Sequence, residues 1–197
     1  MRRRTFDALA SIAGLLLAAV LLAGGGLLLW GHSFVNGQVH SQLAAQKIVF
    51  PGTSSPEFKA LPPADASAMR PYAGQLMVTG AQAQAYADHF IGVHLREMSG
   101  GKTYSQLSAA SLAQPHNTKL AGLVQTVFRG TTLRSMLLNA YAFWQMGQIM
   151  LIAAIVAFTG AGLLLILSAL GFAHVRRAAP EAEVLPRTAA GAQPVAS

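Results

Sequence analysis

The feature that most constrains the fold of this chain is an uncharged apolar run near its C-terminal end. Residues 149–170 include no Asp, Glu, Lys or Arg. A helix of that length, rising about 1.5 Å per residue, crosses a hydrocarbon core of about 30 Å. Tyr141, Phe143 and Trp144 precede the run, and aromatic residues of this kind gather at the membrane surface. We therefore expect a membrane-spanning helix over residues 148–173.

A second uncharged apolar run covers residues 8–30 and follows the basic residues 2–4. A secretory signal peptide also begins with basic residues, but its apolar part spans about 7 to 15 residues and precedes a small-residue cleavage site. The run here is longer and ends at Trp30, and Phe34 follows it closely. These features predict an uncleaved membrane span instead of a signal peptide.

The basic residues that flank the two runs predict the orientation. Arginines precede the first run at residues 2–4 and follow the second at Arg176 and Arg177, whereas no Lys or Arg lies between Trp30 and Lys47. Lys and Arg near a span favour the cytoplasmic side. We expect a multi-pass plasma-membrane protein with both termini in the cytoplasm. Its segments are a cytoplasmic N-terminus (1–7), a first span (8–30), an extracytoplasmic domain (31–147), a second span (148–173) and a disordered cytoplasmic tail (174–197).

Composition supports a chain that is largely solvated by lipid. Hydrophobic residues make up 53% of the chain and charged residues only 11%, whereas a soluble domain carries about 25% charged residues. The net charge of +7 arises in large part from the terminal arginines that fix orientation, so we expect no nucleic-acid partner. Cysteine is absent, which excludes disulfides and thiolate metal sites.

The start of the external segment predicts that the first span continues as a helix to Gln46. Val35, Val39 and Leu43 are spaced by four and form one apolar row. A short extended piece is expected at 47–50. Five prolines then mark residues 51–71 as an irregular excursion without folded elements of its own, although Phe58 and Leu61 offer apolar contacts.

Three further helices and the approach to the second span complete the external domain. Thr79 caps a predicted helix over 80–98 that stops at two glycines. A short helix is expected over 104–113 and another over 118–129. Gly130 is interpreted as a stop, with a new cap at Thr131 before the last helix. The predicted class is an all-α membrane protein whose two transmembrane helices extend outward into a small helical external domain.

Potential catalytic side chains are few and badly placed for convergence. His89 and His94 are five residues apart, about 140° around a helix, so they do not form a two-histidine metal site. We expect His89 to be solvated and His94 to pair with Glu97. The sequence predicts no catalytic residue, no metal site and no cofactor.

Two surfaces remain as candidates for contact with other molecules or between the spans. The first is a ligand or partner surface formed by Tyr86, Phe90 and His94. The second is a helix-pairing face of small residues, which let two backbones approach closely in lipid. Its members repeat every four residues in each span: Ala10, Gly14 and Ala18 in the first, and Ala153, Ala157 and Ala161 in the second.

Three stretches, residues 79–90, 101–105 and 138–144, resemble a family of small actinobacterial two-span membrane proteins of unknown function. The resemblance extends over most of residues 5 to 175. Some chains of this kind bear the name aromatic ring-opening dioxygenase. The resemblance implies the two-span architecture with an external helical domain and assigns no catalytic residue, and the two-histidine, one-carboxylate iron site of such enzymes cannot be assembled from these residues.

The function expected from these patterns is that of a non-enzymatic membrane accessory or interaction protein, for example a subunit of an envelope complex. Its partners would be the lipid bilayer and another membrane or envelope protein, or a second copy of the chain. One alternative is an external module that binds a lipid or small hydrophobic ligand. Another is a metal-dependent enzyme that unites His94, Glu97 and a distant histidine.

Overall fold

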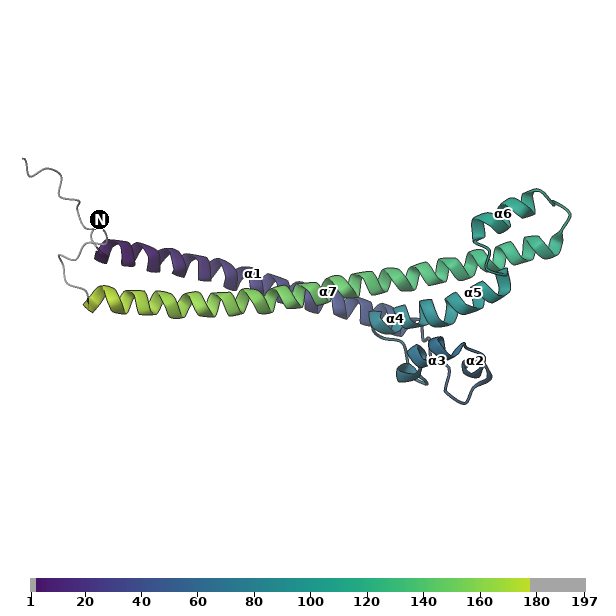
Figure 1. Cartoon of the computed structure of the whole chain (residues 1–197), viewed down its shortest axis with the longest axis horizontal. Helices are drawn as coiled ribbons and strands as arrows, with labels where there is room; N and C mark the ends of the chain where they lie inside the picture. The colour runs from purple at the N-terminus through teal and green to yellow at the C-terminus, as the bar shows by residue number, and fades with distance from the viewer. Residues whose placement is uncertain (1–2, 178–197) are drawn as a thin grey trace, which may run out of the picture. The chain divides into compact units, whose positions relative to one another are not determined.

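The computed structural model describes residues 3–177, and this part of the chain is helical apart from loops and one isolated β-bridge. The all-helical class expected from the sequence is confirmed there. Figure 1 shows two long helices, α1 (Arg3–Ala45) and α7 (Thr118–Arg177), with a small helical region between them in the chain. The elements of that region are α2 (Pro56–Lys59), α3 (Pro63–Met69), η1 (Arg70–Tyr72), α4 (Gly80–Tyr86), η2 (Ala87–Ile91), α5 (Gly92–Ser99) and α6 (Tyr104–Leu112).

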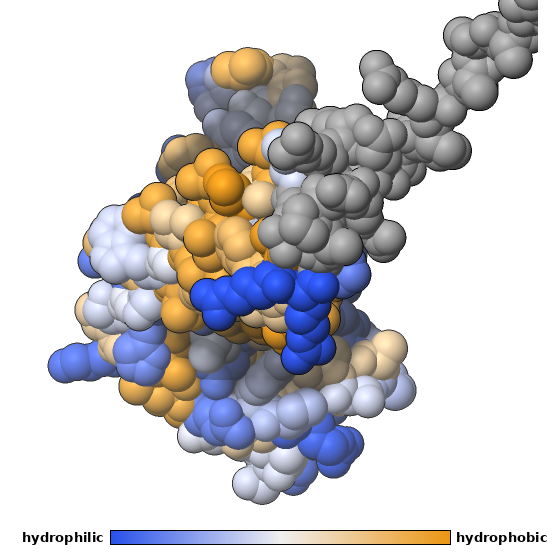
Figure 2. Space-filling view, turned by 90° about the vertical axis from the view of Figure 1, so that its left-hand side faces the viewer, coloured by the Kyte–Doolittle hydropathy of each residue, from blue (hydrophilic) through white to orange (hydrophobic). Residues whose placement is uncertain are grey.

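Helices α1 and α7 are long and apolar enough to cross a membrane. Only 11% of the most apolar window of each helix is buried, whereas the core helix of a soluble protein would be mostly buried there. Large apolar side chains such as Leu16, Leu27 and Val156 are exposed, and Figure 2 shows a broad area of hydrophobic residues on the surface. Both helices are therefore candidate membrane spans.

Helix α7 runs without a break through Gly130, so the predicted stop and new cap at Thr131 are wrong. The glycine lies against α5, because a Cβ placed on it would come within 2.6 Å of Leu95 Cδ2. Thr132 keeps to the helix and donates its hydroxyl to the Phe128 carbonyl at 2.9 Å. Gly130 thus permits close approach of two helices and does not end one.

Residue contacts divide the chain into two units, of which unit 1 comprises Met1–Leu29 and Leu151–Ser197. Within unit 1, α1 and α7 bury small residues that are at most 5% exposed. On α1 these are Ser11 and Ala18, and on α7 they are Ala154, Ala161 and Ser168. Neighbours within each row are seven residues apart, the repeat of helices that wind around each other with a left-handed supercoil.

The predicted pairing face follows a repeat of four, and the buried rows follow a repeat of seven. Four residues turn a helix by about 40° beyond a full turn, while seven fall only about 20° short of two turns. Residues spaced seven apart therefore stay closer to one line along the helix than residues spaced four apart. In the structure Ala18 and Ala161 are fully buried, Gly14 faces Ser168, Ala153 and Ala157 are half-buried, and Ala10 is exposed.

Unit 2 comprises Trp30–Met150 and contains the main hydrophobic core. Helix α1 contributes Val39 and Leu43, both buried, so the apolar row predicted on this part of the helix is confirmed. Large side chains fill the centre, and Phe50, Met69 and Met77 are completely enclosed. The extended piece expected at 47–50 is confirmed in part: Val49 forms an antiparallel bridge with Leu76, but Lys47 lies in a turn with a φ of 54°.

The proline-rich segment 51–71 is folded, so the expectation of an excursion without elements of its own is wrong. Pro56 and Pro63 occupy first helical positions of α2 and α3, where proline is favoured because no N–H is needed there. Ser55 caps α2 by accepting the Phe58 N–H at 3.2 Å. The buried Phe58 and Leu61 attach the segment to the core, as expected from the sequence.

Candidate functional site: an apolar groove between α1 and α7

The predicted helix over 80–98 is present as α4, η2 and α5 in direct succession. Thr79 caps it as predicted, in a capping box with Gln82, and it ends as predicted at Gly100, whose φ is 60°. The middle element, η2, is a π-helix. A π turn inserts an extra residue into the helical repeat, so faces assigned by an ideal helix shift after Ala87.

The predicted ligand surface Tyr86, Phe90 and His94 forms a row of half-buried rings in unit 2. The ring centroids of Tyr86 and Phe90 lie 4.7 Å apart, and those of Phe90 and His94 lie 4.5 Å apart. Phe50 meets Tyr86 edge-on at 5.3 Å, and burial raises the pKa of the Tyr86 phenol. The row thus contributes aromatic packing within the domain, and the cavities below are lined by other residues.

The histidines of unit 2 form bonds that differ from those expected. His89 Nδ1 lies 2.7 Å from Asp65 Oδ1 on α3, so His89 has a bonding partner that was not expected, although its side chain is 39% exposed. His94 Nδ1 lies 2.8 Å from the Phe90 carbonyl of its own helix, and not in the expected pair with Glu97. His32 Nδ1 lies 2.8 Å from the Gly147 carbonyl of α7. Each of these bonds joins or orders parts of the domain.

Sequence reasoning missed an ion pair between α7 and the π-helix. Arg134 donates to Asp88 Oδ1 at 2.6 Å and, through Nε, to the Ala87 carbonyl at 3.1 Å. The same carbonyl accepts the N–H of Gly92 in the π turn. No pattern of spacing marks a π-helix in advance, so the position of Asp88 relative to α7 could not be read from the sequence.

Among residues 3–177, no three His, Asp or Glu side chains gather in a way that could hold a metal ion. His94 and Glu97 are not joined there by a further histidine. Within the described part of the chain, the geometry therefore gives no support to a metal-dependent enzyme.

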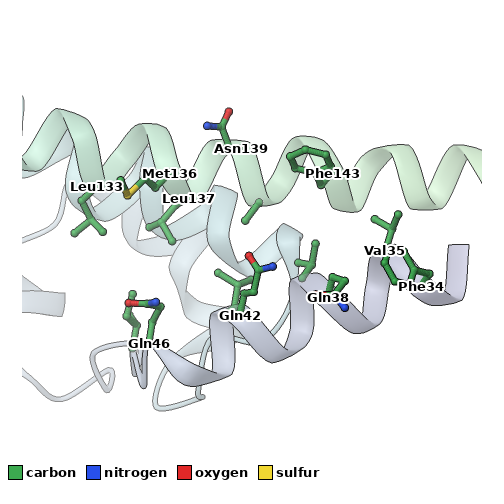
Figure 3. Close-up of a pocket in the computed structure, with 14 residues that line it drawn as sticks. Phe34, Val35, Gln38, Gln42, Gln46, Leu133, Met136, Leu137, Asn139 and Phe143 are labelled. Atoms are coloured by element: carbon green, nitrogen blue, oxygen red, sulfur yellow. The ribbon is translucent and has the colours of Figure 1, made fainter. Parts of the chain in front are cut away.

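The structural feature of unit 2 most suited to binding is a groove of about 580 Å³ between α1 and α7. Figure 3 shows side chains from both helices pointing into the space between them. The lining residues of α1 and of the turn directly after it are Phe34, Val35, Gln38, Val39, Gln42, Leu43, Gln46 and Ile48. From α7 come Leu133, Met136, Leu137, Asn139, Ala140 and Phe143.

The groove is apolar at its floor and uncovered at its rim. Val39, Leu43 and Leu137 form the floor and are buried. At the rim, Met136 is 63% exposed, Phe143 58% and Phe34 55%. Large apolar side chains left in water on both sides of one hollow are typical of a binding surface.

The polar groups of the groove are neutral amides. Gln38 and Gln42 lie four residues apart on α1 and therefore share one side of that helix, and Gln46 follows directly after its end. Asn139 on α7 also lines the groove. The lining residues include no ionisable side chain, so the groove offers hydrogen bonds without a net charge.

Part of this site was visible in the sequence. Met136 and Leu137 follow Leu133 by three and four residues, which predicts one apolar face of a helix, and the row with Val35 and Val39 predicts another. The distance between the two faces is not a property of either pattern.

A smaller hollow of about 380 Å³ lies on the other side of α1, between Asn36, His40 and Trp144.

Comparison of the chain with protein-family models, with curated proteins and with solved structures finds no match. The resemblance described above therefore stays a prediction. Arguments about function have to start from the groove and the two apolar helices.

Proposed function

We propose that the chain is a two-span plasma-membrane protein with both termini in the cytoplasm. The apolar parts of α1 and α7 act as the spans, and residues 31–147 form an extracytoplasmic helical domain. Support comes from the arginines that precede the first apolar run and follow the second. The aromatic residues Trp30 and Trp144 lie at the other end of each run.

The external domain acts as a non-enzymatic binding module, and the groove between α1 and α7 is its binding site. The observation that carries this proposal is the uncovered apolar rim around about 580 Å³ of space. Three histidines of this domain, His32, His89 and His94, are engaged in bonds within it. Binding in the groove agrees with an accessory role in a membrane or envelope complex.

The absence of cysteine allows one set of single-cysteine variants to test both parts of the proposal. For topology, Ser105→Cys on intact cells should react with a membrane-impermeant thiol reagent. Ala189→Cys, which lies outside the described residues, should react only after the cells are opened. The reverse pattern would refute the proposed orientation.

For the binding site, the test is the reactivity of Gln42→Cys in native membranes. The Gln42 side chain is exposed in the unfilled groove, as is that of Gln125 on the part of α7 outside it. An occupant should slow thiol modification at position 42 but not at position 125. Equal rates at the two positions would mean an empty groove and would overturn the proposed function.

A further inference from the structure

We infer that the groove binds one acyl chain of a membrane lipid, an inference that rests on the proposed binding function. Three properties of the groove carry it: its lack of charge, its length and its volume. The main competitor is a helix from another protein or from a second copy of the chain, and cross-linking at position 42 distinguishes a second copy.

The lack of charge favours hydrocarbon over a peptide or an anionic headgroup. The walls consist of aliphatic and aromatic side chains with a row of glutamine amides along α1. A hydrocarbon chain requires no polar partner, and exposed amides remain hydrated beside it. A charged ligand would lose water here without gaining an ion pair from the lining residues.

The length of the groove matches one acyl chain. Phe34 on α1 and Gln46, directly after its end, mark the two ends of the groove, and their separation of twelve residues corresponds to about 18 Å at the rise of a helix. A hydrocarbon core of about 30 Å contains two layers of acyl chains, so one chain is about 15 Å long. A single chain laid along α1 would therefore fill most of the groove.

The volume of the groove, about 580 Å³, is that of a small-molecule site. A volume of this size is ordinary for a small apolar ligand.

The sequence places one end of the groove next to the first span. Phe34 stacks on Trp30 at a centroid distance of 5.7 Å, and Trp30 ends the uncharged run of residues 8–30. In the proposed topology, Phe34 is therefore the membrane-proximal end. An acyl chain would enter from the bilayer at Phe34 and extend toward Gln46.

The test is photolabelling of the full chain, reconstituted in phosphatidylcholine vesicles with a trace of phospholipid that bears a diazirine at the end of one acyl chain. Mass spectrometry of the digested protein should locate adducts on residues 34–46 and 133–143. Adducts in residues 8–30 and 148–173 serve as the internal positive control, since spans contact lipid in any case.

Two variants remove the site by different means. Ala140→Trp fills the groove, and Gln42→Glu puts a carboxylate on its edge while hardly changing the shape of an exposed side chain. Each should lower the groove adducts about tenfold, equivalent to about 1.4 kcal/mol of binding free energy. Their matched controls are Ala142→Trp and Gln125→Glu, exposed positions of α7 outside the groove, which should keep wild-type labelling and melting temperature.

The outcomes separate failure of this inference from failure of the proposed function. Groove adducts that persist in both Ala140→Trp and Gln42→Glu, or adducts confined to the spans, would overturn acyl-chain binding. If Gln42→Cys is nevertheless protected in membranes and forms cross-linked dimers, the groove binds a second copy, and the binding function stands without the lipid. If adducts are absent and position 42 is unprotected, both proposals fail.

Discussion

Helices α1 and α7 contribute to both units of the molecule, yet different kinds of residue lie between them in each. In unit 1 the most deeply buried residues between the helices are Gly, Ala and Ser, and glycines let large side chains such as Phe158 approach closely. In unit 2 the same two helices present valine, leucine and phenylalanine, and a groove separates them. The size of the side chains at facing positions thus decides whether a helix pair closes or leaves a site.

The small residues of unit 1 suit a lipid environment. Lipid tails are as apolar as leucine, so helices in a membrane gain little from burying large apolar residues and must gain from close contact. A Cβ on Gly25 would lie only 3.1 Å from the Phe158 ring. Ser11 meets its own hydrogen-bonding need by donating to the Asp7 carbonyl at 2.7 Å, so it leaves no free donor at the contact.

Unit 2 relies on large buried side chains and on polar bonds between its elements. Phe50, Met69 and Met77 supply the centre of the core. Arg134 and His89 join α7 and α3 to the helix that contains the π turn. A domain held in this way does not need α1 and α7 to touch along their whole length, and this is why the groove can remain open.

The largest loss of stability is expected from Gly80→Ala, because Gly80 is a point of close contact within unit 2. A Cβ there would lie 2.3 Å from Trp144 Cβ, an atom fixed to the backbone of α7. Gly80→Ala should lower the free energy of unfolding by about 3 kcal/mol, because neither backbone can yield without disturbing the core. Thermal unfolding in mild detergent would measure it.

Gly37→Ala is the matched control, since it makes the same change in α1 with nothing within 4 Å of the new Cβ. It should stabilise the protein by about 0.5–1 kcal/mol, the usual gain in a helix interior. A Gly80→Ala variant as stable as Gly37→Ala would show that unit 2 tolerates separation of α4 from α7, contrary to the proposed contrast.

A smaller loss of stability is expected from Ala161→Leu in unit 1. Ala161 is fully buried in the seam, and leucine should hold the helices apart at a cost of about 2 kcal/mol. Ala169→Leu on the exposed side of α7 should unfold like the wild type. The half-buried Ala157 should tolerate leucine better than Ala161, and Gly14→Leu, which meets Ser168, should resemble Ala161→Leu.

If Ala161→Leu and Gly14→Leu both melt at the wild-type temperature, the small-residue seam does not stabilise unit 1. The two units would then differ in side-chain size without differing in how tightly the helices are held.

Local signals in the sequence predicted the elements well. The cap at Thr79 and the stop at Gly100 depend on neighbours within a few residues, and both are present. Such local signals could not predict contacts between segments that lie far apart in the sequence. Gly130 looks the same in sequence whether it ends a helix or accommodates Leu95, and only the packing of α5 on α7 distinguishes the two cases.

The candidate site was predictable to a similar degree. Both apolar rows that line the groove could be read from their spacing, whereas their separation depends on how unit 2 packs. The row of Tyr86, Phe90 and His94 was correctly placed together on one helix. Its burial against Phe50 follows from the chain returning through residues 47–50, which no helical projection includes.

The smallest effect is expected from Tyr86→Phe and concerns unit 2 alone, since all four tyrosines lie between Trp30 and Met150. Burial raises the pKa of Tyr86 above the ordinary value of 10.0. Above that pH the unfolded chain loses the phenol proton while the folded chain keeps it, so the unfolded state binds fewer protons and stability falls as pH rises. Phenylalanine keeps the ring contacts and removes this proton. The variant should therefore match the wild type at neutral pH and lose stability less steeply above about pH 10.

Denaturant unfolding across that range measures the slope of stability against pH. Tyr104→Phe, which removes an exposed phenol, should keep the wild-type slope. A Tyr86→Phe slope equal to that of Tyr104→Phe would mean that the aromatic row is open to water, contrary to the enclosed core described for unit 2.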